Sequence, residues 1–172
     1  ISNGGSSNAS ITVNENIPIV TTVISVDDDT SSTATYSISG TDVDDFSIND
    51  TSGVLTFVST PDYDIPTDSD SDNEYSVIVI ATDSGSLIGT QTIIINVTNV
   101  NDNQPYITSN GGTPTSFISI SENDTSAVTT ITSSDADGVD TATYSISGTD
   151  VGYFFIDSST GVLTFVVTPD FV

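Results

Sequence analysis

Short runs of alternating apolar and polar residues divide the first hundred residues into seven predicted β-strands. The runs are rich in β-branched and aromatic residues, as in Val77-Ile78-Val79-Ile80 and Ile93-Ile94-Ile95, and such residues favour strands. Gly, Asp and Asn lie between the runs, as expected of turns, and no stretch keeps a helical period. The predicted strands lie near 9–13, 19–26, 34–39, 44–49, 53–58, 75–82 and 90–97.

Seven short strands within about 100 residues are typical of a β-sandwich with Greek-key connections of the immunoglobulin-like kind. Hydrophobic residues make up 35% of the chain. Their grouping into strand-like runs argues against the disorder that a high net charge would otherwise suggest. The sequence therefore predicts an all-β protein.

The chain contains a long internal repeat. Residues Thr33–Val43 recur letter for letter as Thr141–Val151, and Gly53–Phe57 recur as Gly161–Phe165. A period of this length indicates a repeated domain and not a solenoid turn. We therefore predict tandem seven-stranded sandwiches, with a complete repeat at 1–98, a linker at 99–105 and a second repeat at 106–172.

The second copy lacks counterparts of residues 65–107, so it is expected to form the first five strands without the last two. A sandwich without those strands would expose its core and its sheet edges. Two explanations remain open, namely a chain that continues beyond this segment and a second subunit that supplies the strands, as in a filament. The continuing chain is the favoured explanation.

The charge composition excludes many kinds of function. The chain has 24 Asp and Glu residues, no Lys, Arg, His or Cys, and a net charge of −24. It cannot form a basic nucleic-acid groove, a Walker loop, a Ser-His-Asp or Cys-His nucleophile system or a His/Cys zinc site. It has no apolar run long enough to span a membrane. We do not expect an enzyme.

The acidic residues follow particular strands, and alternate loops of a sandwich collect at opposite ends. Close carboxylates repel by roughly 1 to 4 kcal/mol at about 4 Å, and this chain offers only protonation or a metal to offset that. Oxygen ligands in flexible loops favour Ca²⁺ over Mg²⁺. One end gathers Glu15, Asp62, Asp64 and the Asn101–Asn103 segment, and the other gathers Asp27, Asp29 and Asp83, whose first two members match Asp135 and Asp137 in the second copy.

The order of these motifs resembles the cadherin repeat, across the whole chain apart from the missing end of the second copy. The Asn101-Asp102-Asn103-Gln104-Pro105 segment, with Asp-x-Asp and Ala-x-Asp-x-Gly in the right order, is the most specific part. The other matching pieces are Val13–Asn16, Asp27–Asp29, Pro61–Asp64, Ala81–Gly85, Ser121–Asn123 and Asp135–Asp137.

The resemblance implies about three Ca²⁺ ions at a complete junction between repeats. Glu15, Asp62, Asp64, Asp102 and the Val100 carbonyl would hold the inner two ions, with Asp137 bridging from the second copy. Asn101, the Asn103 carbonyl, Asp135 and Asp137 would hold the third. Asp27, Asp29 and Asp83 would serve a junction with an upstream repeat. Two positions depart from the family pattern, because Asn99 stands where Asp is usual and Asp64 where Glu is usual.

The resemblance implies an extracellular or cell-surface structural or adhesive protein, part of an adhesin or filament, with tandem repeats stiffened by Ca²⁺. Its expected partners are adjacent repeats or other copies of the chain, without nucleic acid. The alternative is a spacer or carbohydrate-associated module of a larger secreted enzyme. The acidic loop Asp68–Glu74 starts like a Ca²⁺ loop but has Val79 where an EF-hand requires Glu, so a solvated loop is the favoured interpretation.

Overall fold

The computed structural model describes residues 3–28, 33–138 and 141–170. The chain forms two compact units, Ile1–Val100 and Asn101–Val172. The boundary between the units falls within the predicted linker at 99–105. No helix of the described ranges is both long and apolar enough to cross a membrane.

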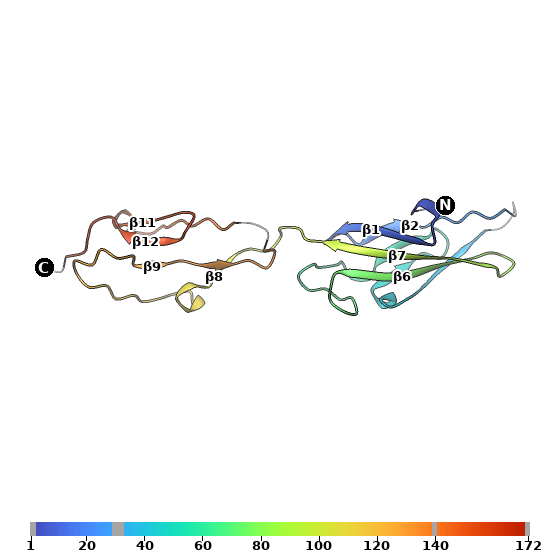
Figure 1. Cartoon of the computed structure of the whole chain (residues 1–172), viewed down its shortest axis with the longest axis horizontal. Helices are drawn as coiled ribbons and strands as arrows, with labels where there is room; N and C mark the ends of the chain where they lie inside the picture. Colours follow the sequence, from blue (N-terminus) through green and yellow to red (C-terminus); the bar gives the residue numbers. More distant parts are fainter. Residues whose placement is uncertain (1–2, 29–32, 139–140, 171–172) are drawn as a thin grey trace. The chain divides into compact units, whose positions relative to one another are not determined.

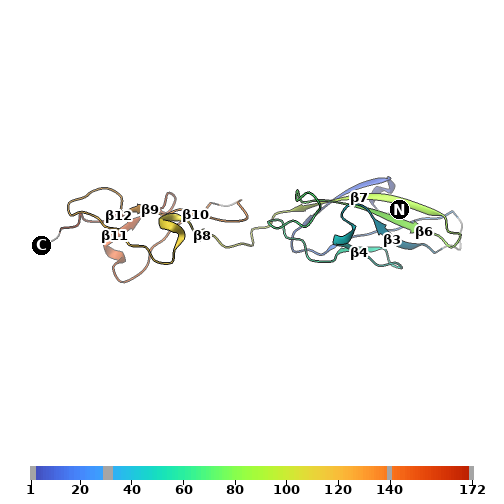
Figure 2. The ribbon, with the colours of Figure 1, turned by 90° about the horizontal axis from the view of Figure 1, so that it is seen from below.

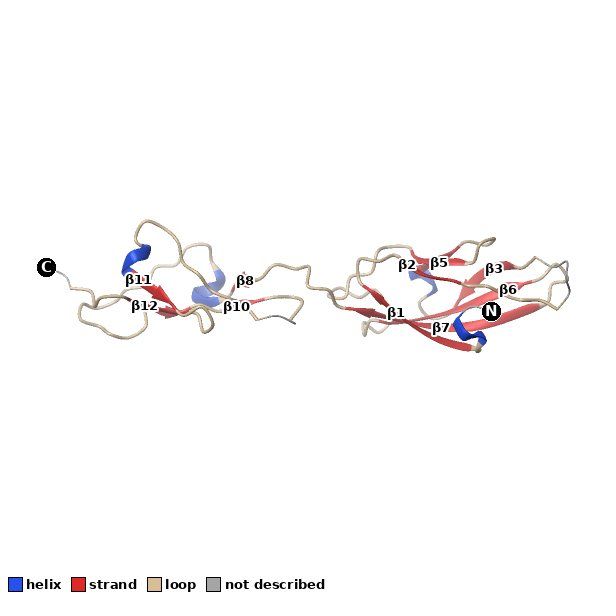
Figure 3. Ribbon diagram, turned by 90° about the horizontal axis from the view of Figure 1, so that it is seen from above, coloured by secondary structure: helices blue, strands red, loops and turns tan. Residues whose placement is uncertain are grey.

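The first unit is a β-sandwich of two layers (Figures 1 and 3). One layer is a four-stranded sheet in the order β1-β7-β6-β3, and the other is a three-stranded sheet in the order β2-β5-β4. The elements are η1 (Asn3–Gly5), β1 (Asn8–Asn14), β2 (Ile19–Thr22), β3 (Thr35–Ser39), η2 (Val43–Asp45), β4 (Phe46–Ile48), β5 (Val54–Phe57), β6 (Glu74–Thr82) and β7 (Ile88–Thr98).

The β6–β7 hairpin forms the centre of the larger sheet, because both other strands of that sheet pair with it. The two strands pair antiparallel from Glu74↔Asn96 to Thr82↔Ile88. Strand β3 adds antiparallel to β6, and β1 adds parallel to β7. All seven predicted strands are present, although β2 ends at Thr22 and not near residue 26.

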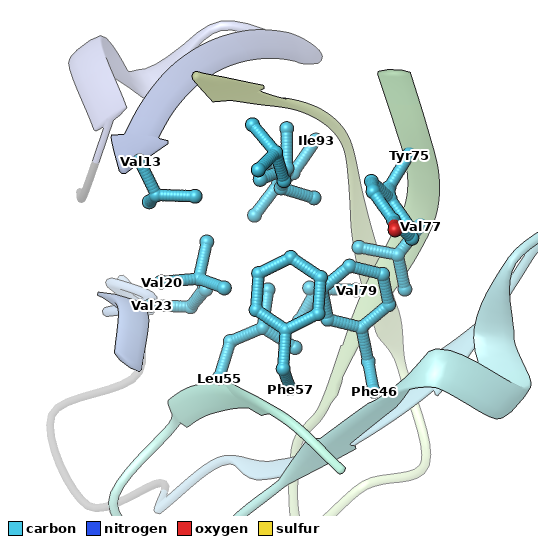
Figure 4. Packing of buried hydrophobic residues seen from close by; sticks show 12 residues of the cluster. Val13, Val20, Val23, Phe46, Leu55, Phe57, Tyr75, Val77, Val79 and Ile93 are labelled. Carbon is cyan, nitrogen blue, oxygen red and sulfur yellow. The ribbon is translucent and has the colours of Figure 1, made fainter. Parts of the chain in front are cut away.

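The core lies between the two layers (Figure 4). Alternate residues of β6 and β7 point inward, and Tyr75, Val77, Ile93 and Ile95 are almost completely buried. Figure 4 shows that Tyr75, Val77 and Ile93 face Leu55 and two aromatic residues of the smaller sheet. The Phe46 and Phe57 rings lie 4.5 Å apart between centroids, and Tyr75 meets both edge-on at 5.8 and 5.2 Å. Edge-to-face contacts of this kind stabilise a core beyond the area they bury.

A glycine fixes the turn between β4 and β5 in each repeat. Gly53 has φ +69°, a conformation that favours glycine, and a Cβ there would collide with the Val23 carbonyl oxygen. The close approach allows the Val23 N–H to donate to the Gly53 carbonyl at 2.8 Å. Gly161 has φ +68° and the same relation to Ile131. The repeated Gly-Val-Leu-Thr-Phe segment therefore preserves a backbone contact as well as a strand.

The second unit keeps the smaller sheet of the first (Figure 2). Its sheet has the order β11-β12-β9, which corresponds to β4-β5-β2. The Phe154 and Phe165 rings lie 4.8 Å apart, like their counterparts in the first unit. The elements are β8 (Tyr106–Ile107), η3 (Ser109–Gly112), β9 (Thr129–Thr130), β10 (Ser133–Ser134), η4 (Val151–Tyr153), β11 (Phe154–Ile156) and β12 (Val162–Phe165), with β8 paired to β10.

The prediction of five strands in the second copy is wrong for two of them. The counterparts of the first and third predicted strands, residues 116–120 and 142–147, have no strand structure. In the first unit the equivalent strands pair only with β7 and β6, and the second copy has no counterpart of either in this chain. Without a partner, these segments lack the ladder hydrogen bonds that define a strand.

We predict that Leu55→Ala lowers the free energy of unfolding of the first unit by about 2–5 kcal/mol, because it leaves a cavity in the core. Leu55 is fully buried, whereas Leu87 is 71% exposed. Leu87→Ala is therefore the matched control and should change stability by less than about 0.5 kcal/mol. Urea unfolding followed by circular dichroism measures both, and equal effects would contradict the assignment of the core.

We predict that Asp157 makes the second unit sensitive to acid. Hydrogen bonds from the Thr160 and Ser159 backbone N–H groups lower the pKa of Asp157 below its usual value of 3.8. The lowered pKa means that the stabilisation is present above the unfolded-state pKa and is lost as the pH falls through the folded-state pKa. The loss should therefore occur below about pH 4.

Asn49 is the control built into the chain, because its side-chain oxygen accepts the equivalent bonds from Thr51 and Ser52. Asp157→Asn should keep the turn but remove its share of the pH dependence. Urea midpoints measured between about pH 6 and pH 2.5 in Ca²⁺-free buffer test this. Unchanged pH dependence in the variant would refute it.

Candidate metal centre

Glu15 is a buried carboxylate at the end of the first unit where β1 and β7 finish. Its backbone N–H donates to the Thr98 carbonyl at 3.0 Å, which aligns it with the last residue of β7. The side chain is 2% exposed. Its Oε2 accepts from the Tyr63 N–H at 2.8 Å and its Oε1 from the Val100 N–H at 2.6 Å. The carboxylate thus joins three separate segments and remains oriented by two backbone donors.

A second carboxylate lies next to Glu15. In the turn after β5, the Asp62 Oδ1 accepts a hydrogen bond from the Asp64 N–H at 3.0 Å. The half-buried Asp64 offers a carboxylate oxygen within 4.8 Å of one from Glu15. Two negative groups this close repel each other when one of them is removed from water. The geometry therefore creates a position where a cation would be stabilised.

In the second unit, Asp137 is a buried carboxylate. It is 4% exposed, and Asn103 contacts both of its oxygens, with the backbone N–H at 2.9 Å from Oδ2 and Nδ2 at 3.0 Å from Oδ1. The Asn103 side chain is the main reason why the pKa of Asp137 lies below its usual value, and burial opposes the shift. Asp135 Oδ1 accepts from the Asp137 N–H at 3.1 Å. The structure therefore brings Asn103, Asp135 and Asp137 together.

The linker positions fall on both sides of the unit boundary. Val100 ends the first unit and donates to Glu15. Asn101 and Asp102 begin the second unit, and both are exposed. Asp102 Oδ1 accepts from the Asn103 side-chain amide at 3.2 Å.

The opposite end of the first unit holds two more of the predicted ligands, Asp27 and Asp83. Asp83 lies in the turn between β6 and β7, where its Oδ1 accepts a hydrogen bond from the Leu87 N–H at 2.7 Å. Asp27 and Asp83 line the same open cavity, as the sequence predicted. Strand β6 has nine residues and runs from the end that holds Glu15 to this end. That length corresponds to about 30 Å. Asp29 lies outside the described residues.

The acidic loop before β6 is largely exposed to solvent, in line with the interpretation favoured from the sequence, but its first residue is buried. Asp68 is 4% exposed and accepts from the Asp72 and Asn73 N–H groups at 2.8 and 3.3 Å. Its oxygen lies within 4.8 Å of one from Asp70 and one from Asp72. The charge of Asp72 is the main cause of a raised pKa at Asp70. The Asp-x-Asp-x-Asp spacing in the sequence predicts this second cluster of carboxylates. No feature of the neighbouring sequence predicts that Asp68 is buried.

The side chains brought together at each of these places are carboxylates and amides. They offer oxygen donors, in part oriented by backbone N–H groups, and no nitrogen or sulfur ligand. A donor set of this type fits a hard divalent cation, and Ca²⁺ accepts irregular arrangements of carboxylate and carbonyl oxygens. Acidic clusters of this chain could therefore hold such an ion.

Comparisons of sequence and of structure both relate this chain to cadherins. The family model described as the cadherin domain matches residues 9–98. Human protocadherin Fat 1 is 33% identical over 166 residues, which cover 92% of this chain and 3% of that protein. Rat cadherin-23 is 36% identical over 100 residues, covering 55% of this chain and 3% of that protein.

Two solved structures share the fold. The human protocadherin-24 EC1-2 structure (form II) aligns with TM-score 0.71 and 20% identity over 93% of this chain and 75% of that chain. The mouse cadherin-23 EC22-24 structure aligns with TM-score 0.66 and 20% identity over 94% of this chain and 52% of that chain. The chain spans only a small part of the length of the curated relatives. With a family model that matches more than half of its residues, the chain belongs to the cadherin family.

Proposed function

We propose that this chain is part of an extracellular adhesive or structural protein in which Ca²⁺ stiffens the junction between tandem repeats. Cadherins are cell-surface adhesion proteins whose domains bind Ca²⁺. The segment is too small a part of its relatives to carry over their individual partners. The proposal therefore rests on the family and on the acidic groups of each unit.

The buried Glu15 is the observation that carries the proposal. Both of its oxygens are oriented by backbone donors, and Asp64 adds a second carboxylate within 4.8 Å. The chain has no basic side chain that could neutralise them. A divalent cation offsets this repulsion without requiring protonation, and Ca²⁺ is millimolar in the environment where extracellular modules work.

We assign the ligands of three ions from the order of the motifs. Asp62 belongs to the same turn as Asp64, whose N–H donates to the Asp62 carboxylate, and Asp102 follows two residues after Val100. Asp137 would bridge the inner and outer ions, and its hydrogen bonds from Asn103 support its assignment to this group. The inner two ions use Glu15, Asp62, Asp64, Asp102 and the Val100 carbonyl, with Asp137. The third uses Asn101, the Asn103 carbonyl, Asp135 and Asp137.

In the family, the third ion has one more ligand, which is the residue of the second repeat that corresponds to Asp83. This chain does not include that residue, so its third ion should bind more weakly than the inner two. Asp27, Asp29 and Asp83 form the corresponding half-site for an upstream repeat. The cavity shared by Asp27 and Asp83 supports this assignment.

Homophilic contacts between copies of the chain are part of the proposal. A structure of protocadherin gammaB7 EC3-6, 20% identical to this chain, is described as a cis-dimer, which makes self-association a reasonable expectation. A filament is the more specific version, in which another copy supplies partners for residues 116–120 and 142–147. Strands from a continuing chain are the simpler source. The mass of the natural polypeptide distinguishes them, since a filament of short subunits requires a mass near 17.8 kDa.

We predict that Ca²⁺ stabilises the chain with dissociation constants of about 0.1 to 1 mM. Ligand linkage raises the free energy of unfolding by about 1.4 kcal/mol for each site at a Ca²⁺ concentration ten times the dissociation constant. Titration calorimetry measures the binding, and thermal unfolding in Ca²⁺ and in chelator measures the stabilisation. Identical melting curves with no heat of binding would refute the Ca²⁺ proposal.

We predict that Asp64→Asn weakens the tightest Ca²⁺ binding by about tenfold or more, because it removes one charge next to Glu15. The variant is preferable to a change at Glu15, which also accepts two backbone hydrogen bonds. Asp50→Asn is the matched control, since Asp50 is exposed in the turn between β4 and β5. Equal affinities for Asp64→Asn and Asp50→Asn, measured by calorimetry, would remove Asp64 from the ligand set.

A further inference from the structure

Asn73, near the end of the acidic loop Asp68–Glu74, is held on both sides through its backbone. Its N–H donates to Asp68 Oδ1 at 3.3 Å, and its carbonyl accepts a hydrogen bond from the Val97 N–H of β7 at 3.0 Å. Its φ is +67°, in the left-handed region that Asn enters more readily than most residues other than glycine. The backbone at position 73 is therefore fixed between a buried carboxylate and the larger sheet.

The side chain of Asn73 reaches out of this loop to the turn that carries two of the predicted Ca²⁺ ligands. Its Nδ2 donates to the Tyr63 carbonyl at 2.9 Å, and Tyr63 lies between Asp62 and Asp64. Its Oδ1 is shielded from solvent. Only the nitrogen of the amide can donate to a carbonyl oxygen, so the amide has one favourable orientation. A single side chain thus joins the acidic loop to the turn after β5.

One planar peptide unit connects this contact to Asp64. The Tyr63 carbonyl and the Asp64 N–H lie in the same peptide plane. The carbonyl accepts from Asn73 Nδ2, and the N–H donates to Asp62 Oδ1 at 3.0 Å. Hydrogen bonds at both edges fix the orientation of the plane. They also fix the direction in which the Asp64 side chain leaves the backbone.

The orientation of this turn matters because it opposes the repulsion between two carboxylates. Glu15 and Asp64 have oxygens within 4.8 Å of each other, and like charges at that distance favour a movement apart. The Tyr63 N–H donates to Glu15 Oε2 at 2.8 Å, so Tyr63 is held by Glu15 on its amide side and by Asn73 on its carbonyl side. A turn fixed in this way keeps the two carboxylates together before an ion binds, which lowers the cost of ordering them.

We propose that Asn73 is a positioning residue for the Ca²⁺ ligands Glu15 and Asp64, and that it acts by holding the 62–64 turn through the Tyr63 carbonyl. Asn73 is not a ligand itself, and the acidic loop serves as its support without an ion of its own. This inference deepens the proposed function and rests on it. Groups that orient metal ligands without touching the metal change its affinity when they are removed.

The test variant is Asn73→Gly in the full chain, because glycine accepts a φ of +67° and keeps both backbone hydrogen bonds while it removes Nδ2. Ser71→Gly is the matched control. Ser71 is exposed in the same loop and has φ +60°, so both variants make the same change to the backbone. In titration calorimetry, Asn73→Gly should raise the dissociation constant of the tightest Ca²⁺ site by about tenfold. Ser71→Gly should leave it unchanged.

Amide hydrogen exchange gives a second readout, which does not require Ca²⁺. In chelator, Asn73→Gly should accelerate exchange of the Tyr63 and Asp64 N–H groups, because the turn that orders them is loosened. The amides of the β6–β7 hairpin should keep their rates, since local opening does not involve the core. Coupling between the turn and the ion is reciprocal, so Ca²⁺ should slow exchange of the same two N–H groups in the wild-type chain.

Wild-type affinity in Asn73→Gly would overturn this inference and leave the proposed function intact. Equal weakening by Ser71→Gly would also overturn it, because the loop as a whole and not the Asn73 amide would then determine the affinity. Faster exchange of the hairpin amides together with those of the turn would reduce Asn73 to a general structural role. A wild-type chain that binds no Ca²⁺ would overturn the proposed function and this inference with it.

Discussion

The whole chain is constrained by negative charge that no side chain of opposite sign can offset. Every ion pair that a typical domain uses is excluded, so each carboxylate must face water, accept hydrogen bonds or bind a cation. The buried carboxylates of Asp42 and Asp68 accept backbone hydrogen bonds. Glu15 has backbone donors as well, and other carboxylates lie within 4.8 Å of both Glu15 and Asp68, so repulsion remains at both places. We place the metal near Glu15 because this residue belongs to the motifs that resemble the cadherin ligands, whereas Asp68 does not.

Identical local sequence gives different structure in the two units. Thr35–Ser39 forms β3 by pairing with β6, but the same five residues at 143–147 have no strand structure. The two segments differ in what lies beside them, because β6 has no second-copy counterpart. The smaller sheet persists in the second unit because all three of its strands are present in both copies. A strand in this fold is thus specified by its partner as much as by its own residues.

This explains how far the fold and the candidate site could be predicted. Alternation of apolar residues located all seven strands of the first unit, since that pattern directly reflects which side chains face the core. The motifs also placed Asp27 and Asp83 together at one end. The sequence could not reveal that Tyr63 and Val100 both donate to Glu15, or that Asp68 is buried. Those contacts join residues that are far apart in sequence or depend on how a loop closes, and neither leaves a periodic pattern.

The internal repeat separates what the fold requires from what a particular position in an array requires. Several residues that both copies share, such as Leu55 and Leu163 or Gly53 and Gly161, lie inward or fix a turn, and packing or a close backbone contact explains them. Where they differ on an outward position, the fold tolerates either residue. A change from Ser47 to Phe155, both of them exposed, increases the apolar surface that faces water. The two units thus share one scaffold, whose surface can be adapted to different neighbours without altering its core.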